Sequence, residues 1–307
     1  MRLAIDFGGT NIKIGLLDDQ ASFLDRKDVP LADFPAGQGF FPDFLDYLEH
    51  YLNGRSPEYI GMATKGGVRL DTAEVSSDIG AGQFLIGADL RKNFESRFKA
   101  PFYLDNDARA YALGEYSFGA GRGSNTLLCM TLGTGVGSAL VHNGMPYATS
   151  DPVGGLLGGH ISIDRQGIPC SCGNKGCLEG YVSATALLKM IDKNHPELLN
   201  GDTDPIAAFF EAGAREPESL IGKHVSAFQN DLTLGLVNII HAYSPDRIVI
   251  GGGVARSASV FLPRVVEMVS KMAWTSPRGA TRIIASELGD NAALLGMAFH
   301  PLLKSHT

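Results

Sequence analysis

The chain has 307 residues, of which 44% are hydrophobic and 19% are charged, and its formal net charge is −7. This composition excludes a disordered or fibrous protein, and the length suits two domains better than one. An acidic chain without a dense basic run is not expected to bind nucleic acid through bulk charge. The uncharged stretch 123–150 is broken by glycines and fits two strands better than a membrane span. Since the N-terminus shows no apolar run of signal-peptide length, we expect a cytoplasmic location, no membrane partner, and cysteines that are reduced or metal-bound.

The first part of the chain opens with a predicted β-hairpin and continues as alternating helices and strands. Apolar runs on both sides of Gly8-Gly9-Thr10 are typical of a hairpin with a glycine-rich tip. Apolar residues at helical spacing then alternate with short β-forming runs. In order, the pattern predicts strands over 2–6 and 12–17, a helix over 40–52, a strand over 59–63, a helix over 90–98, a strand over 102–104 and a helix over 108–116.

The hairpin pattern recurs in the second part, with strands over 127–132 and 138–141 around the turn 133–137. A third glycine cluster, 251–253, follows a strand over 247–250 and precedes a helix. A strand–turn–strand opening that occurs twice indicates a duplicated α/β fold, with two domains and a cleft between them. The expected domains are residues 1–118, onto which a last helix over 291–303 packs back, and the larger 119–290, which begins in the glycine-rich segment 118–124 and contains the cysteine loop.

The glycine-rich tips are candidates for binding the phosphates of ATP. Successive backbone N–H groups bind phosphate oxygens, and glycine lets the backbone approach closely. Asp6, at the end of the first strand, could hold Mg²⁺ through water. An ordinary tight turn is the alternative for any one tip, but two matched tips and a third cluster beside a helix N-terminus favour a nucleotide. The candidate ATP-binding residues are Asp6, Gly8, Gly9, Thr10, Asn11, Lys13, Gly133, Thr134, Gly135, Val136, Gly137, Gly252 and Gly253.

A second candidate site is the tripeptide Asp105-Asn106-Asp107 at the end of a predicted strand. Phosphoryl transfer to a sugar needs a carboxylate that accepts the proton of the hydroxyl, and Asp107 suits that role. Asn106 could fix a neighbouring hydroxyl. The alternative is a helix N-cap, for which Asp and Asn are favoured residues, and both roles are compatible.

Three of the four cysteines cluster with a histidine, as Cys170, Cys172, Cys177 and His160. Three thiolates and one imidazole complete a closed tetrahedral zinc site, so we expect a structural Zn²⁺ that shapes an irregular loop. Glu179 follows this loop and is a candidate hydrogen-bond acceptor for a sugar hydroxyl. The alternative is that Glu179 is a solvent-exposed residue at the start of a helix.

Together these motifs resemble the ROK family of repressors and sugar kinases over nearly the whole chain. The resemblance is carried by Asp6–Asn11, Leu104–Ala108, Leu132–Gly137, Gly159–His160, Cys170–Glu179 and Gly251–Val254. It implies the duplicated actin-like, hexokinase-like ATPase fold and a kinase that phosphorylates a sugar, with the 6-hydroxyl as the family expectation. It also implies that the tips bind ATP phosphates, that the third glycine cluster lies near adenosine, and that the protein forms a dimer or tetramer. The residue roles implied are Asp107 as general base, Asn106, His160 and Glu179 as sugar contacts, and His160 as a zinc ligand as well.

The chain departs from the family pattern at three sugar-side positions. Family sugar kinases usually carry Glu three residues before the zinc histidine, where this chain has Leu157. Pro-Gly is replaced by Lys65-Gly66, and a common Asn by Asp78. Gly66 and Asp78 stay among the candidate substrate-binding residues. The departures favour a modified hexose over glucose, with N-acetylmannosamine as a specific alternative; the other interpretation is that these loops contact nothing.

Two other functions compete with the kinase. Repressors of the family carry an N-terminal helix-turn-helix, whereas the first strand is predicted to begin at Leu3 and the chain is acidic. A sugar-sensing protein without turnover is the second alternative; Asp6 and Asp107 argue against it, and Leu157 leaves it open.

Overall fold

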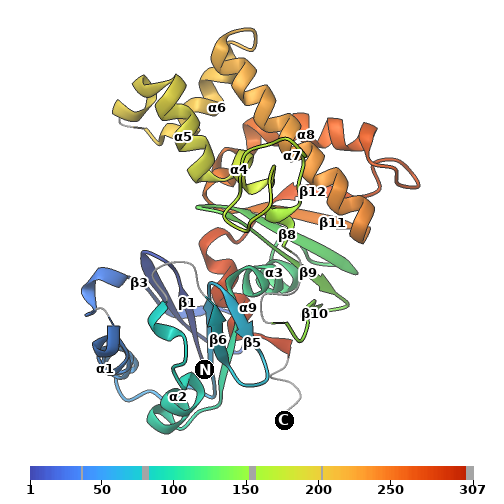
Figure 1. Ribbon diagram of the computed structural model, residues 1–307. Helices are drawn as coiled ribbons and strands as arrows, with labels where there is room; N and C mark the ends of the chain where they lie inside the picture. Colours follow the sequence, from blue (N-terminus) through green and yellow to red (C-terminus); the bar gives the residue numbers. More distant parts are fainter. Residues whose placement is uncertain (36, 78–82, 152–156, 202, 302–307) are drawn as a thin grey trace. The chain divides into compact units, whose positions relative to one another are not determined.

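The computed structural model describes residues 1–35, 37–77, 83–151, 157–201 and 203–301 (Figure 1). The chain divides into two compact units. Unit 1 comprises Met1–Phe118, Gly144–Gly155 and Asp290–Thr307, and unit 2 comprises Gly119–Asn143 and Leu156–Gly289. The segment 144–155, which the sequence placed in the second domain, is thus assigned to unit 1. Asp78 lies outside the described residues.

The main sheet of unit 1 has the strand order β3-β2-β1-β4-β7. β1 pairs antiparallel with β2 and parallel with β4, and β4 is parallel to β7. A separate two-stranded sheet pairs β5 with β6. The strands of unit 1 are β1 (Arg2–Phe7), β2 (Asn11–Leu17), β3 (Phe23–Pro30), β4 (Ile60–Thr64), β5 (Gly67–Arg69), β6 (Glu74–Ser77), β7 (Phe102–Asn106) and β10 (Met145–Pro146).

The helices of unit 1 are α1 (Phe40–Leu52), α2 (Leu90–Phe98), α3 (Asp107–Phe118) and α9 (Ala292–Ala298). α1 buries its apolar face against β1, where the ring of Phe7 meets Phe40 and Phe44 edge to face. α9 lies beside α3 and β1, although it comes almost two hundred residues after α3 (Figure 1). Glycine allows α3 and α9 to pack this closely, because a β-carbon on Gly114 or Gly296 would overlap the backbone of the facing helix.

The sheet of unit 2 contains the order β9-β8-β11-β12. β8 pairs antiparallel with β9 and parallel with β11, and β11 is parallel to β12. A core of aromatic side chains from three helices and aliphatic strand residues fills this unit. Its elements are β8 (Thr126–Leu132), β9 (Val136–His142), α4 (Glu179–Val182), α5 (Ala184–Asn194), α6 (Pro205–Arg215), α7 (Leu220–Tyr243), β11 (Arg247–Gly251), α8 (Ala258–Met272) and β12 (Arg282–Ala285).

Both sheets therefore begin with an antiparallel hairpin and continue with parallel strands on the same side of it. This arrangement confirms the duplicated α/β fold predicted from the two matched hairpins. The helices over 40–52 and 90–98 are also confirmed at both ends. Among the described residues, no helix combines the length and the apolar character needed to cross a membrane.

Several predicted boundaries are wrong. The second turn covers only Gly133–Gly135, because Val136 and Gly137 already pair with β8 as strand residues. Gly251 ends β11 instead of following it. α9 ends at Ala298, short of the predicted helix end. The sequence prediction also omitted β3, α5, α6 and α7, since no chemical motif drew attention to these segments.

Candidate active site

The first candidate cluster lies at the carboxyl edge of the parallel strands of unit 1. Phe7 of β1 pairs with Thr64 of β4, and Thr64 pairs with Asn106 of β7. Three strand ends are thus in one row, with β4 in the middle. Adjacent strands are about 4.8 Å apart, so the residues after these ends are near neighbours. Those residues are Gly8, Lys65 and Asp107.

The tip between β1 and β2 is a tight turn in which the N–H of Gly8 donates to the carbonyl of Asn11 at 3.1 Å. A β-carbon on Gly8 would lie 2.6 Å from that carbonyl oxygen, which only glycine avoids. Thr10 and Asn11 are exposed, and the carbonyl of Thr10 accepts the N–H of Leu31. The tip therefore presents backbone and a hydroxyl to an incoming ligand, as a phosphate site requires.

Asp6 and Lys13 face each other across the first hairpin. Their carboxylate and ammonium groups are 3.5 Å apart, and Lys13 also pairs with Asp290 at 2.9 Å. Burial raises the pKa of Asp6, and the charge of Lys13 opposes this effect. A carboxylate next to a turn that is a candidate for binding phosphate has the oxygen chemistry that suits Mg²⁺.

Asp107 is the first residue of α3, and its side chain is partly buried. Its Oδ1 accepts the N–H of Ala108 at 2.9 Å. Burial and the negative charge of Asp6 raise the pKa of Asp107 to about 6, while the positive charge of Lys65 lowers it. A carboxyl group with a pKa close to neutrality can gain and lose a proton under physiological conditions, as a general base must.

Asn106 supplies the helix cap that the sequence offered as the alternative interpretation. Its Oδ1 accepts the N–H groups of Ala108 and Arg109, at 3.0 and 3.3 Å. Its Nδ2 donates to the carbonyl of Gly66 at 3.2 Å, which joins β7 to the loop after β4. Gly66 adopts a φ of +85°, a conformation that favours glycine. Asn106 thus positions both Asp107 and the Lys65-Gly66 loop.

Asp105 turns into the interior, where it forms a buried ionic network. Its carboxylate accepts Arg109 Nε at 2.6 Å and lies 3.0 Å from His300 Nε2. Burial would raise its pKa, but the hydrogen bond from His300 and the charge of Arg109 hold the pKa below its ordinary value. Asp105 is therefore an anchor beneath the strand end, and Asp107 is the carboxylate of the tripeptide that can meet a substrate.

The tip between β8 and β9 in unit 2 carries an acidic partner. Glu179, the first residue of α4, accepts the N–H of Val136 on its Oε2 at 2.9 Å. A β-carbon on Gly135 would lie 2.5 Å from the same oxygen. Thr134 is exposed, and its carbonyl accepts the hydroxyl of Thr185. The structure thus joins the predicted sugar residue Glu179 to a tip that the sequence assigned to phosphate, and this carboxylate uses the N–H of Val136.

The third glycine cluster lies beside the same tip. Gly252 follows β11 with a φ of +84°, and a β-carbon there would lie 2.6 Å from the carbonyl oxygen of Leu132 at the end of β8. The next residue, Gly253, begins a short 3₁₀ helix and has open space where its side chain would be. Two predicted ATP-binding segments of unit 2 therefore lie side by side, with an open backbone surface at Gly253.

The four predicted metal ligands converge in a loop of unit 2. One donor atom from each of His160, Cys170, Cys172 and Cys177 lies within 4.8 Å of all the others. Cys170 Sγ is 3.5 Å from His160 Nδ1, and Cys172 Sγ is 3.6 Å from Cys177 Sγ. A tetrahedral zinc site requires edges of about 3.6 and 3.8 Å for these pairs. The donor set and its spacing therefore fit Zn²⁺.

The backbone of this loop holds the ligands in place. The N–H of Cys170 donates to the carbonyl of Asn174 at 2.8 Å. At Gly176, where φ is +67°, a β-carbon would lie 1.8 Å from the carbonyl oxygen of Asp164. Leu178 follows the last ligand and is fully buried in the core of unit 2. A closely packed backbone and a buried leucine thus connect the candidate metal ligands to Glu179.

Leu157 stands directly before the 3₁₀ turn Gly158–His160, which carries the candidate metal ligand His160. Its side chain is 51% exposed, so it is not a core residue of unit 2. Single exposed apolar side chains are common on protein surfaces, so this exposure shows only that Leu157 is accessible.

Lys65 was noted in the sequence as a departure on the sugar side, but it was not counted among the candidate site residues. A β-carbon on Gly9 would lie 3.0 Å from Lys65 Nζ, so the ammonium group lies directly over the first tip. Its charge also acts on Asp107. The signal was present in the sequence: Thr64-Lys65 ends a strand in the same way as Asn106-Asp107, but only the strand register brings the two together.

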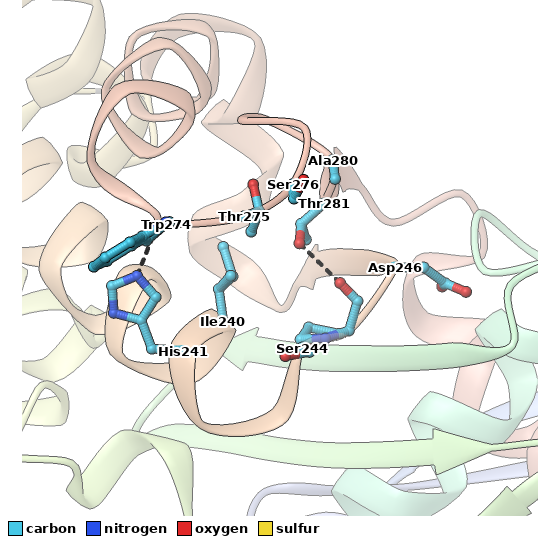
Figure 2. A pocket seen from close by; sticks show the side chains of 10 residues that line it. Ile240, His241, Ser244, Asp246, Trp274, Thr275, Ser276, Ala280 and Thr281 are labelled. Carbon is cyan, nitrogen blue, oxygen red and sulfur yellow. Dashed lines mark hydrogen bonds between the residues drawn. The ribbon is translucent and has the colours of Figure 1, made fainter.

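A separate cavity of about 550 Å³ opens elsewhere in unit 2 (Figure 2). Asp246 and Thr281, which line it, precede β11 and β12, whereas Gly252 follows β11. The cavity therefore lies at the amino ends of the parallel strands, opposite to the glycine cluster. Trp274, 84% exposed, lies beside His241, whose Nε2 accepts the backbone N–H of Trp274 at 2.8 Å (Figure 2). The candidate residues of unit 2 lie outside its lining.

Comparisons with known proteins agree on one family. The sequence profile of the ROK family matches residues 2–302. The glucokinase of Halalkalibacterium halodurans is 29% identical over 96% of this chain and 92% of its own length. A ROK family glucokinase from Streptomyces griseus, solved in complex with glucose and AMPPNP, is 27% identical with a TM-score of 0.78, covering 97% of both chains. The xylose repressor of Bacillus spizizenii is 30% identical, but the match covers 68% of this chain and 53% of the repressor.

Proposed function

This chain belongs to the ROK family and is an ATP-dependent carbohydrate kinase, and we propose that it transfers the γ-phosphoryl group of ATP to the 6-hydroxyl of a hexose or modified hexose. The observation that carries the proposal is Asp107. This carboxylate lies at a strand end beside the Gly8–Thr10 turn, and its pKa is raised to about 6. A base with a pKa near neutrality and a turn that can bind phosphate are two of the parts that phosphoryl transfer uses.

In the proposed reaction the 6-hydroxyl oxygen attacks the γ-phosphorus of ATP. A new O–P bond forms, and the bond between the γ-phosphorus and the β,γ-bridging oxygen breaks, so that ADP leaves. The hydroxyl proton passes to Asp107 and later to water. Asn106 supports this step by fixing Asp107 at the start of α3, because it caps the same helix turn. No covalent enzyme intermediate is required.

We propose that ATP is bound by backbone groups of both glycine tips and by the Gly252-Gly253 turn. The narrow turn at Gly8 and the open surface at Gly253 support this assignment. Asp6 fits Mg²⁺, since that ion is usually held by one or two carboxylates together with substrate phosphates. When bound, Mg²⁺ would neutralise phosphate charge; Lys13 holds the Asp6 carboxylate in position for it.

We propose that the Cys₃His cluster holds one structural Zn²⁺. Four protein ligands close the coordination shell, so the ion would leave no position for substrate. Its role would be to fix the loop that carries Glu179 and His160, the proposed sugar contacts. An assembly of two or four chains stays a prediction from the family resemblance, and a cytoplasmic location stays a prediction from the sequence.

The substrate is proposed to be a hexose other than unmodified glucose. Leu157 cannot accept a hydrogen bond where family kinases usually offer a carboxylate. A glucose hydroxyl facing Leu157 would have no hydrogen-bond partner, at a cost of about 1–3 kcal/mol. An acyl methyl group has no hydrogen bond to lose and would not carry this cost. N-acetylmannosamine is therefore the first candidate to compare with glucose.

The test is kcat/KM for glucose, N-acetylglucosamine, N-acetylmannosamine, fructose and allose, with ADP release and sugar phosphate both measured. We expect a modified hexose to lead the panel, and Leu157→Glu to move the preference toward glucose. If glucose leads with the unmodified protein, the argument from Leu157 is wrong. Binding of a sugar with no phosphorylation of any would instead indicate a sugar-sensing member of the family.

A further inference from the structure

One cation lies at the first glycine tip without belonging to the tip itself. Lys65 follows β4, the strand between β1 and β7, so the register places it between Gly8 and Asp107. Its Nζ would be 3.0 Å from a β-carbon on Gly9, and its charge lowers the pKa of Asp107. The ammonium group therefore stands over the turn that would hold phosphate and within electrostatic reach of the proposed base.

The loop that carries Lys65 is built to hold this position. Thr64 is buried at the end of β4, and the carbonyl of Gly66 accepts Asn106 Nδ2. Lys65 is thus bracketed by a paired strand residue and a hydrogen-bonded glycine. Within the described residues, no carboxylate forms an ion pair with Lys65, whereas Lys13 on β2 is paired with Asp6 and Asp290. Of these two lysines, Lys65 is the one available to an anionic ligand.

We propose that Lys65 binds the γ-phosphoryl group of ATP over the Gly8–Thr10 turn and accompanies it toward the acceptor hydroxyl. This inference rests on the proposed kinase function. The transferred group carries its charge on three equatorial oxygens, and an ammonium group offers three donors without a fixed plane. A cation there also favours the ionised form of Asp107, since an opposite charge nearby stabilises a carboxylate. The proline common at this position in the family could do neither.

The first measurement is nucleotide binding without sugar. AMPPNP and ADP, each with magnesium, are titrated into the wild-type protein and into Lys65→Met. We expect the variant to lose about tenfold to a hundredfold in affinity for AMPPNP, the range for a hydrogen bond to a charged group. Its affinity for ADP should change little, because ADP lacks the group that Lys65 contacts. Unchanged ADP binding also shows that the variant is folded.

Two matched variants control for charge and shape. Lys65→Arg keeps the cation and should retain most of the preference for AMPPNP over ADP. Lys92→Met removes a charge from an exposed position on α2 of the same unit and should behave as the wild type. Equal loss of AMPPNP affinity in Lys65→Met and Lys92→Met would show only a net-charge effect and would overturn the inference.

The second measurement is the pH dependence of kcat/KM with the best sugar of the panel. Asp107 must be ionised to accept a proton, so activity should rise with pH through about 6. Asp107 faces Asp6, which raises its pKa, and Lys65, which lowers it; Lys13, Asp28 and Asp290 act on Asp6. Removing the cation in Lys65→Met should move the acid limb to higher pH, whereas Lys65→Arg should leave it in place.

The outcomes separate this inference from the proposed function. Loss of AMPPNP preference in Lys65→Met, with no sugar of the panel phosphorylated by the wild type, supports γ-phosphate binding by Lys65 and rejects the proposed transfer to these sugars. Normal sugar phosphorylation by the wild type, with unchanged AMPPNP preference in Lys65→Met, rejects Lys65 alone. A raised KM for sugar with normal AMPPNP binding would place Lys65 against the sugar instead. Failure of the wild type to bind AMPPNP would overturn both.

Discussion

The two hairpin tips have the same strand–turn–strand form but opposite charges above them. In unit 1, the Lys65 ammonium group lies over Gly9. In unit 2, the Glu179 carboxylate lies over Gly135 and accepts the N–H of Val136. Similar glycine patterns therefore face a cation in one unit and an anion in the other, and the turn sequences alone do not reveal this.

This difference predicts that each tip favours a different chemical group of its ligand. A cation over the first tip favours the most highly charged part of the nucleotide, the γ-phosphate, while a carboxylate over the second tip favours hydroxyl groups and leaves only backbone groups for the phosphate contacts proposed there. The two units also differ after the parallel strand next to each hairpin. Lys65, a cation, follows β4 in unit 1, whereas Gly252, which has no side chain, follows β11 in unit 2. We infer that the chemical step belongs to the edge of unit 1, and that the second tip serves both the nucleotide and the sugar.

The largest expected effect is that of Asp107→Asn at the edge of unit 1. The amide keeps the shape and can still accept the N–H of Ala108, but it cannot take the proton of the sugar hydroxyl. We expect kcat to fall by roughly 10²–10⁴-fold, the usual size of general-base catalysis, with AMPPNP binding retained. Steady-state kinetics and a binding titration check both parts. Near-normal turnover would remove Asp107 from the mechanism and the chemical step from unit 1.

The metal loop should act on the second tip and not on the first. In Cys172→Ser we expect the bound zinc to fall from about one ion per chain to near zero. Sugar kcat/KM should fall by about 10–100-fold as Glu179 loses its support, the range seen when groups around a metal are changed. Metal content and kinetics on protein purified without chelators are the measurements.

Cys129→Ala is the control for Cys172→Ser, because Cys129 is a buried residue of β8 outside the cluster. The Cys129→Ala protein should therefore keep the bound zinc. Wild-type protein that contains no zinc would contradict the assignment of the cluster. Loss of AMPPNP affinity in Cys172→Ser, with sugar affinity intact, would reverse the roles given to the two tips.

The smallest expected effects come from one pair of substitutions, Gly9→Ala and Gly135→Ala. At Gly135 the new β-carbon would lie 2.5 Å from Glu179 Oε2, so the carboxylate must move; at Gly9 it would lie 3.0 Å from Lys65 Nζ and would push the ammonium group aside. Gly9→Ala should weaken AMPPNP binding about tenfold, and Gly135→Ala should raise the KM for sugar by a similar factor, each the size of one lost hydrogen bond. If Gly9→Ala instead raised the KM for sugar and Gly135→Ala weakened AMPPNP binding, the charges over the tips would not select the ligand.

The sequence alone was sufficient to predict the architecture and the residues of the candidate metal cluster. Two glycine-tipped hairpins predicted the duplicated fold, because strands need extended β-forming runs and tight tips need glycine, and both requirements are local. The four candidate metal ligands, which the structure brings together, were predicted in the same way, since they lie almost wholly within one loop. Asp107 was singled out because it follows a strand and begins a helix.

The partner groups that each of these motifs contacts depend on the tertiary structure. Lys65 meets Gly9 and Asp107 only because β4 lies between β1 and β7 in a particular register, and strand pairing over such distances in sequence leaves no local pattern. Glu179 reaches Gly135 because the metal loop folds back on β9. The pKa of Asp107 likewise depends on burial and on Asp6, a residue distant in the chain. Charge acts through space and not along the sequence, so the sequence named the reactive groups and the fold set their partners.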